Sequence, residues 1–205
     1  MGLDMWVYKA RKLTTNEVKL INGKTRAEAD NIVPHVTIFD TPKDDEEKLM
    51  LRDIMPFCRT IKVINEYWDV EKIKETVGAN KEDDCFIWHI HYLPLDLVDL
   101  KVTITEPSGE HYIKELSNIN CDDYTLCKEE DAYAVVLEEI AYWRKNYQLQ
   151  EELQDEYAVN GLGGLINCGY HKINNGMMKV LRALDDEGRF KGMRLTNNLF
   201  YHEWY

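Results

Sequence analysis

Two histidines separated by one residue, His89 and His91, have a spacing that can support chemistry. They lie in residues 85–92 (CFIWHIHY), where alternation of large apolar and polar residues predicts a β-strand. Alternate side chains of a strand share a face, so both imidazoles are expected on the same side as Cys85. Sheet-based metal sites present ligands in this way, and His111 would supply a third. The ordinary interpretation, which we favour, is a polar strand face, so no metal and no cofactor is predicted.

A second histidine pattern lies at residues 34–37 (PHVT), which resembles half of the signature of two-histidine phosphoesterases. These enzymes carry two His-x-Thr strands, whereas here only His35 is followed by a hydroxyl residue two positions later. If the protein is an enzyme, we expect a metal-dependent or two-histidine hydrolase that uses His35, His89 and His91. Convergence of these three residues in one pocket would indicate catalysis.

The candidates for binding a ligand are Tyr142, Arg144 and Lys145. They fall in a segment with helical spacing, in which Trp143 would be buried while Arg144 and Lys145 point outward. An arginine can hold an anion through two N–H donors. In so acidic a protein, however, we expect Arg144 to pair with a carboxylate of the chain itself.

Composition predicts one globular domain over residues 1–205, with 44% hydrophobic and 30% charged residues. The formal net charge of −12 repels phosphate backbones and anionic membrane surfaces, so neither direct nucleic-acid binding nor membrane binding is expected. Acidic runs such as 151–156 are interpreted as solvated helix faces. The alternative is a folded acidic surface that imitates nucleic acid.

The cysteines and the N-terminus indicate a compartment. Five cysteines without paired spacing favour reduced thiols over disulfides or a zinc site. The first residues lack the features of a signal peptide, and no run reaches the about 18 apolar residues of a membrane span. The predicted location is the cytoplasm.

The strands and helices expected from the sequence indicate an α+β fold, with a small, mainly antiparallel sheet packed against several helices. Strands are expected at 3–8, at 32–39 on an edge because of Pro34, and at 85–92, followed by a hairpin of 101–106 and 111–116. Helices are expected over 41–55, 70–77, 128–157 and 175–184, with the glycines at 161–164 beyond the end of the longest one. The helix over 128–157 is expected to provide the central packing surface.

Three segments occur in the same order in a group of small bacteriophage-encoded proteins: residues 1–5 (MGLDM), 139–145 (EIAYWRK) and 167–170 (NCGY). The chain resembles this group over residues 1–10 and, more loosely, over 132–205. The group has no established activity. The resemblance therefore implies a phage or prophage gene product in the bacterial cytoplasm, and we expect a non-enzymatic accessory protein that binds a host protein or a small ligand. Formation of a homo-oligomer stays open.

Overall fold

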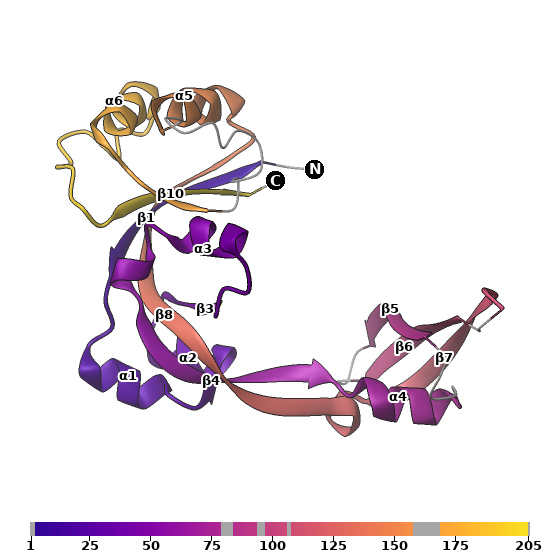
Figure 1. Ribbon diagram of the computed structural model, residues 1–205. Coiled ribbons are helices and arrows are strands. Elements are labelled where there is room, and N and C mark those ends of the chain that lie inside the picture. The colour runs from indigo at the N-terminus through magenta and orange to yellow at the C-terminus, as the bar shows by residue number, and fades with distance from the viewer. Residues whose placement is uncertain (1–2, 79–83, 94–96, 106–107, 158–168, 205) are drawn as a thin grey trace. The chain divides into compact units, whose positions relative to one another are not determined.

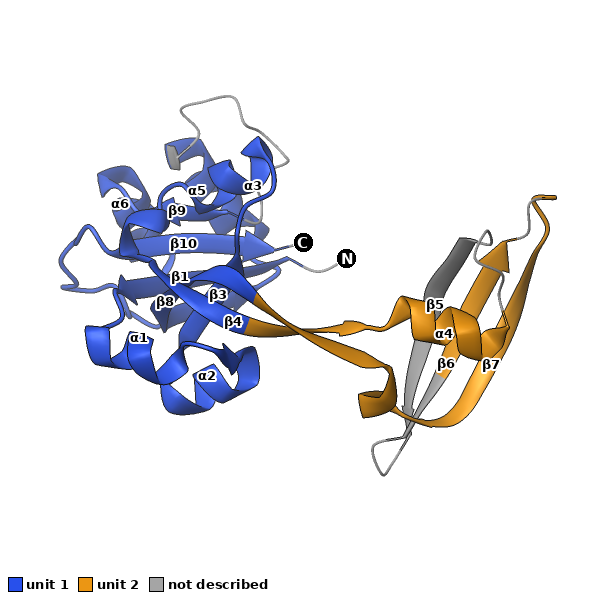
Figure 2. Ribbon diagram, turned by 60° about the horizontal axis from the view of Figure 1, so that its bottom comes forward, with its two compact units in different colours: residues 1–63, 130–205 blue, residues 64–129 orange. Residues whose placement is uncertain are grey.

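The computed structural model describes residues 3–78, 84–93, 97–105, 108–157 and 169–204, with the backbone alone at 84–93, 97–99 and 157. The fold is α+β and its sheets are mostly antiparallel, which confirms the predicted class. The chain forms two compact units, unit 1 (residues 1–63 and 130–205) and unit 2 (residues 64–129), shown in Figure 2. The expectation of one domain over 1–205 stays a prediction.

Unit 1 is built on a sheet whose strands come from both ends of the sequence (Figure 1). Its order is β2 (Lys24–Thr25), β4 (Arg59–Trp68), β8 (Thr125–Arg144), β1 (Asp4–Arg11), β10 (Leu199–Trp204) and β9 (Tyr170–Lys172), and β3 (Val36–Asp40) also pairs with β8. The predicted strand at 3–8 is confirmed as β1. Residues 32–39 form a strand only from Val36, because α2 (Arg26–Ile32) occupies the start of that segment.

The predicted helix over 128–157 is wrong. Residues 125–144 form the long strand β8, and only α5 (Tyr147–Tyr157) is helical. A bulge in the pairing with β1 explains the error, since Val7 pairs with Ala141 and Tyr8 with Glu139, which leaves Ile140 as an extra residue. Residues 132, 134 and 136 therefore share a face of the sheet with residues 141 and 143, which follow the bulge. The even-to-odd change makes the spacing of apolar residues resemble a helical period.

One face of the unit 1 sheet is covered by two pairs of helices, which lie at different places along β8 in Figure 1. α5 and α6 (Asn175–Leu184) pack their buried residues over Leu3, Met5, Val7 and Ala141. α1 (Thr15–Ile21) and α2 cover Ala132, Ala134 and Val136. Helices α1 and α2 each begin with a capping box, in which a threonine and a glutamate bond each other's backbone N–H groups.

The other face of this sheet is covered in part. Helix α3 (Asp45–Leu51) and the short helix η1 (Met55–Phe57) lead to a small core in which Ile54 and Phe57 pack with Phe200. Asp44 caps α3 by accepting a hydrogen bond from the Glu47 N–H at 2.9 Å, so the helix begins later than the predicted position 41.

Unit 2 consists of a three-stranded antiparallel sheet and one helix. Its strands β5 (Asp84–Leu93), β6 (Leu97–Thr105) and β7 (His111–Asn120) lie in sequence order, and η2 (Cys121–Tyr124) follows. α4 (Val70–Val77) packs Ile73 and Val77 on Leu100, Val102 and Ile104, and it ends at Gly78 with φ of 71°. These elements confirm the predicted strand at 85–92, the hairpin, the helix over 70–77 and its glycine cap. Among the described residues, no helix is long and apolar enough to cross a membrane.

Candidate functional site

Four aromatic side chains form a continuous row across four neighbouring strands of unit 1. The row runs from Tyr142 on β8 through Trp6 on β1 and His202 on β10 to Tyr170 on β9. The ring centroids lie 5.4 Å apart for Tyr142 and Trp6, 5.5 Å for Trp6 and His202, and 4.4 Å for His202 and Tyr170. We call this set of four rings the aromatic row.

The row follows from strand alternation and register. Along β1 the buried Met5 and Val7 face helices α5 and α6, so Trp6 must face the opposite side. Residues directly opposite each other in an antiparallel ladder share a face, and Trp6 pairs with Tyr142 on one side and His202 on the other. The register therefore brings distant parts of the sequence onto one surface.

The aromatic row is open at one end and covered at the other. The Tyr142 end is open, and 40% of Tyr142 is exposed. Trp204, two residues after His202 on the same face of β10, is 62% exposed. At the other end Tyr170 meets the edge of Phe39, with centroids 5.2 Å apart, and both pack into the small core beneath α3. Together, the row, Tyr8 and Trp204 are called the aromatic surface below.

Charged groups border the open end of the aromatic surface. The Tyr142 hydroxyl donates a hydrogen bond to Asp4, and the Arg144 Nε lies 3.9 Å from the Asp4 Oδ1. The hydrogen bond to Asp4 is the main reason that the pKa of Tyr142 is raised, and the negative charge of Glu139 adds to it. Glu139 also contributes, after burial, to raising the pKa of Tyr8 to about 12. Two carboxylates and one guanidinium therefore surround these rings.

His202 is held as a neutral ring in the row. Its Nδ1 lies 3.1 Å from the Gly169 carbonyl oxygen, which can only accept, so this nitrogen carries a proton. Burial lowers the pKa of His202 more than this hydrogen bond raises it. His202 stacks on Tyr170 with an interplanar angle of 5°. The imidazole thus serves as an aromatic spacer between Trp6 and Tyr170.

The structure places two of the three predicted ligand-binding residues at this surface. Tyr142 and Arg144 lie two residues apart on β8 and share its open face, although on a strand rather than a helix. Arg144 has Asp4 as its carboxylate partner, but the distance is long and 67% of its side chain is exposed. Lys145 follows the strand with φ of 57°, and its N–H donates to the Leu3 carbonyl at 2.7 Å.

Trp143 lies on the opposite face of β8. Its ring stacks on Phe190 with centroids 6.0 Å apart, and the guanidinium of Arg189 lies 4.6 Å from the ring centroid. Trp143, which was expected to be buried, is therefore partly buried against the core of the helix-covered face.

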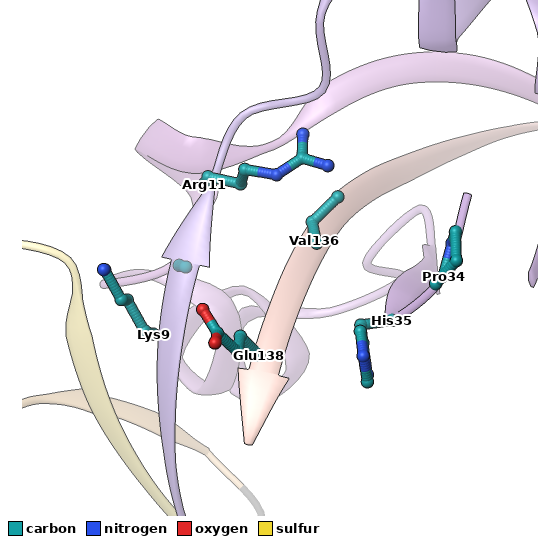
Figure 3. A pocket seen from close by; sticks show the side chains of 7 residues that line it. Lys9, Arg11, Pro34, His35, Val136 and Glu138 are labelled. Atoms are coloured by element: carbon teal, nitrogen blue, oxygen red, sulfur yellow. The ribbon is translucent and has the colours of Figure 1, made fainter. Parts of the chain in front are cut away.

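His35 lines a separate cavity of about 420 Å³, whose other lining residues include Lys9, Arg11, Pro34 and Glu138 (Figure 3). In the β8 sequence Glu138 lies between Val136, beneath α1 and α2, and Ala141, beneath α5 and α6. His35 has φ of 64°, a conformation unfavourable for histidine, and its carbonyl accepts from the Leu137 N–H at 2.9 Å.

The charges of this cavity are nearly balanced. Arg11 donates hydrogen bonds to both carboxylate oxygens of Glu17, at 2.9 and 2.8 Å. These bonds are the main reason that the pKa of Glu17 is lowered to about 2. The remaining charged groups at the cavity are Lys9 and Glu138, which face each other in the β1–β8 ladder. An anion therefore meets little net positive charge here.

The predicted metal ligands lie in unit 2, whereas His35 lies in unit 1. In the sheet of unit 2, His89 of β5 pairs with Lys101 of β6, and His111 of β7 pairs with Thr105 of β6. Lys101 and Thr105 are four residues apart, so the two histidines are separated by roughly 13 Å along the strand direction. The side chains of His89 and His91 lie outside the described residues. Among the described side chains, no group of three or more His, Cys, Asp or Glu is placed to hold a metal ion. The metal site and the two-histidine site stay predictions.

A buried carboxyl group was missed by the sequence analysis. Glu203 is 2% exposed and lies beneath α5, where it accepts hydrogen bonds from the Tyr201 hydroxyl and, at 2.6 Å, from the Gln154 side chain. Burial raises the pKa of Glu203, and hydrogen bonds from Tyr201, Gln154 and Gln150 oppose that rise. The group joins α5 to β10 within the core.

Trp6, Tyr170 and His202 were also missed as site residues. Alternation along residues 3–8 placed Trp6 opposite Met5 and Val7, but it gave no information about which strands lie beside β1.

No protein-family model, no curated protein and no solved structure matches this chain.

Proposed function

We propose that this protein is a non-enzymatic binding protein that recognises a protein partner through its aromatic surface. The observation that carries the proposal is the aromatic row, a stack of four rings whose Tyr142 end is open to solvent. In line with the resemblance to phage-encoded proteins, the proposed setting is the bacterial cytoplasm, with a host protein as the partner.

The composition of the surface supports this proposal. Tyrosine and tryptophan are enriched among the residues that dominate protein–protein binding, since they bury a large area at a low cost in side-chain entropy. Trp204 and Tyr142 are two such residues, and both are exposed. Tyr142 adjoins Trp6, which is already stacked between neighbouring rings and is therefore fixed before a partner arrives.

The contrast between the two faces of the sheet also supports it. The side of β1 that carries Met5 and Val7 is closed by α5 and α6. On the other side, α3 and η1 cover the Phe200 end of the sheet and leave Tyr142 and Trp204 exposed. An apolar surface of this kind is typical of an interaction site.

A hydrolase that uses His35 is the second candidate. The observation in its favour is that His35 lines a cavity and has a positive φ, because strained backbone is often found at functional sites. Against it, no serine, threonine or cysteine accompanies His35 among the residues that line this cavity, and Glu138 is level with Lys9 in the β1–β8 ladder.

The proposal is tested by capture from a lysate of the bacterial host. Wild type is compared with the double variant Tyr142→Ala, Trp204→Ala, which removes the two exposed rings, and with Tyr147→Ala, which removes an exposed ring on α5. We expect one protein to be retained by wild type and by the Tyr147 variant and reduced about tenfold or more in the double variant. Equal capture by a correctly folded double variant would contradict the proposal.

A further inference from the structure

The rings at the open end of the aromatic surface have the geometry that attracts a positive charge. Trp6 and Tyr142 lie 5.4 Å apart with their planes inclined by 39°, and the electron-rich faces of such rings bind cations, tryptophan best. This chain already uses the interaction on the opposite face, where Arg189 sits over Trp143. In the described part of the chain, no cation sits over Trp6 or Tyr142 in this way.

Negative charge surrounds these rings. Asp4 accepts a hydrogen bond from the Tyr142 hydroxyl, and Glu139 lies directly opposite Tyr8 in the β1–β8 ladder. At longer range the whole protein has a net charge of −12. Such a field raises the local concentration of cationic partners and speeds their association, particularly at low salt.

Arg144 is the one described cation paired with Asp4, and it is weakly attached. Its Nε lies 3.9 Å from the carboxylate, which is longer than a hydrogen bond, and two thirds of its side chain is exposed. An incoming guanidinium or ammonium group can therefore displace it. A cationic partner would compete with Arg144, whereas an anionic partner would use it.

We infer that the partner presents arginine or lysine side chains to the aromatic surface, where they stack on Trp6 and Tyr142 and place their charge beside Asp4 and Glu139. This inference rests on the proposed function, since it names the chemistry of the partner of that surface. It assigns Arg144 a competing role and not the role of an anion clamp.

The test measures binding of labelled peptides to the full-length protein by fluorescence anisotropy. The probes are a short peptide of alternating Arg and Gly, its Glu-Gly and Ser-Gly counterparts, and a single-stranded DNA of similar length. We expect the Arg-Gly peptide to bind, with affinity falling as salt is raised, and the other three to bind at least about tenfold more weakly. Preferred binding of the DNA or of the Glu-Gly peptide would overturn the inference.

Variants separate the surface from the general charge of the protein. Tyr142→Leu removes a ring but keeps apolar bulk, and it should weaken Arg-Gly binding about 2- to 5-fold. Glu139→Gln should weaken it more than Glu151→Gln, which removes the same charge from an exposed site on α5. Equal effects of the two glutamate variants would show attraction by net charge alone and would overturn the inference.

The direction in which Arg144→Gln changes the affinity for the Arg-Gly peptide distinguishes a cationic partner from an anionic one most clearly. Loss of the competing guanidinium should tighten Arg-Gly binding about twofold or more, while an anionic partner would bind less well. Unchanged or weaker Arg-Gly binding by this variant contradicts the inference. The proposed function would survive that result if the partner captured from lysate still depends on Tyr142 and Trp204, so the two failures can be distinguished.

Discussion

Trp143 and Tyr142 are neighbours in sequence, yet they show the two different uses that this sheet makes of aromatic residues. The ring of Trp143 stacks on Phe190 and lies 4.6 Å from the guanidinium of Arg189 on the helix-covered face, whereas Tyr142 lies at the open end of the aromatic row. The same alternation separates Met5 from Trp6 on β1. Near this end of the sheet, therefore, successive residues alternate between the helix-covered face and the open face, for which we propose a role in recognition.

The largest expected effect is on stability, on the helix-covered face. Leu153 of α5 is fully buried in the core over β1, so Leu153→Ala should lower the free energy of unfolding by about 2–5 kcal/mol. Tyr142→Ala on the open face should lower it by no more than about 1 kcal/mol. Urea denaturation followed by circular dichroism measures both. Similar losses would mean that the open face also holds the fold together.

The buried Glu203 makes the stability of the helix-covered face depend on pH. Its pKa is raised in the folded protein, so the folded state binds the proton more tightly than the unfolded state. Its contribution to stability is thus fullest below the unfolded pKa of about 4.5 and is lost as pH rises through the folded pKa.

Glu203→Gln removes this dependence while keeping a side chain that can bond Tyr201 and Gln154. We expect the variant to be more stable than wild type at pH 7, by a margin that shrinks as the pH is lowered toward 4. Unfolding free energies measured across this pH range provide the test. A margin that is constant with pH would show that Glu203 does not titrate as described.

An intermediate effect is expected at His35. Its φ of 64° costs about 1–2 kcal/mol for a residue with a side chain, whereas glycine accepts it freely but is more flexible when unfolded. His35→Gly should therefore raise the unfolding free energy by about 0.5–1 kcal/mol, and His35→Val should lower it. Thermal unfolding of both variants gives the result. A glycine variant less stable than wild type would indicate that the imidazole makes a stabilising contact.

The smallest effect concerns the cation over Trp143. Arg189→Lys keeps the charge beside Asp185 but loses the planar guanidinium, which should cost about 0.5 kcal/mol in chemical denaturation. A cost well above this value would show that the hydrogen bond from Arg189 Nε to Asp185, and not stacking on Trp143, fixes Arg189.

The sequence predicted the fold class and several elements, but not the arrangement of the sheet. Strong local signals succeeded, as at α4, where apolar spacing and Gly78 agree, and at α6. Two local signals were overlooked. The starts of α1 and α2 carry the spacing of a capping box, with Thr14 and Glu17 in α1 and Thr25 and Glu28 in α2.

Other features depend on long-range pairing, which no local pattern contains. Residues 132–137 of β8 are covered on both faces, and the strand carries a bulge at Ile140, so its apolar residues resemble a helix. Tyr142 and Arg144 were selected as candidates from the sequence, whereas their neighbours Trp6 and His202 come from the two ends of the chain. Only the register of β1 with β8 and β10 brings them together.

The most direct test of the account is fluorine NMR of the protein labelled with fluorotryptophan, titrated with the host protein captured by the wild type. Single Trp→Phe variants assign the resonances. If the aromatic surface is the recognition site, the Trp6 and Trp204 signals shift on binding, while the signal of Trp143, on the helix-covered face, does not. A partner that shifts Trp143 and leaves Trp6 and Trp204 unchanged would contradict the claim that the aromatic surface is the recognition site.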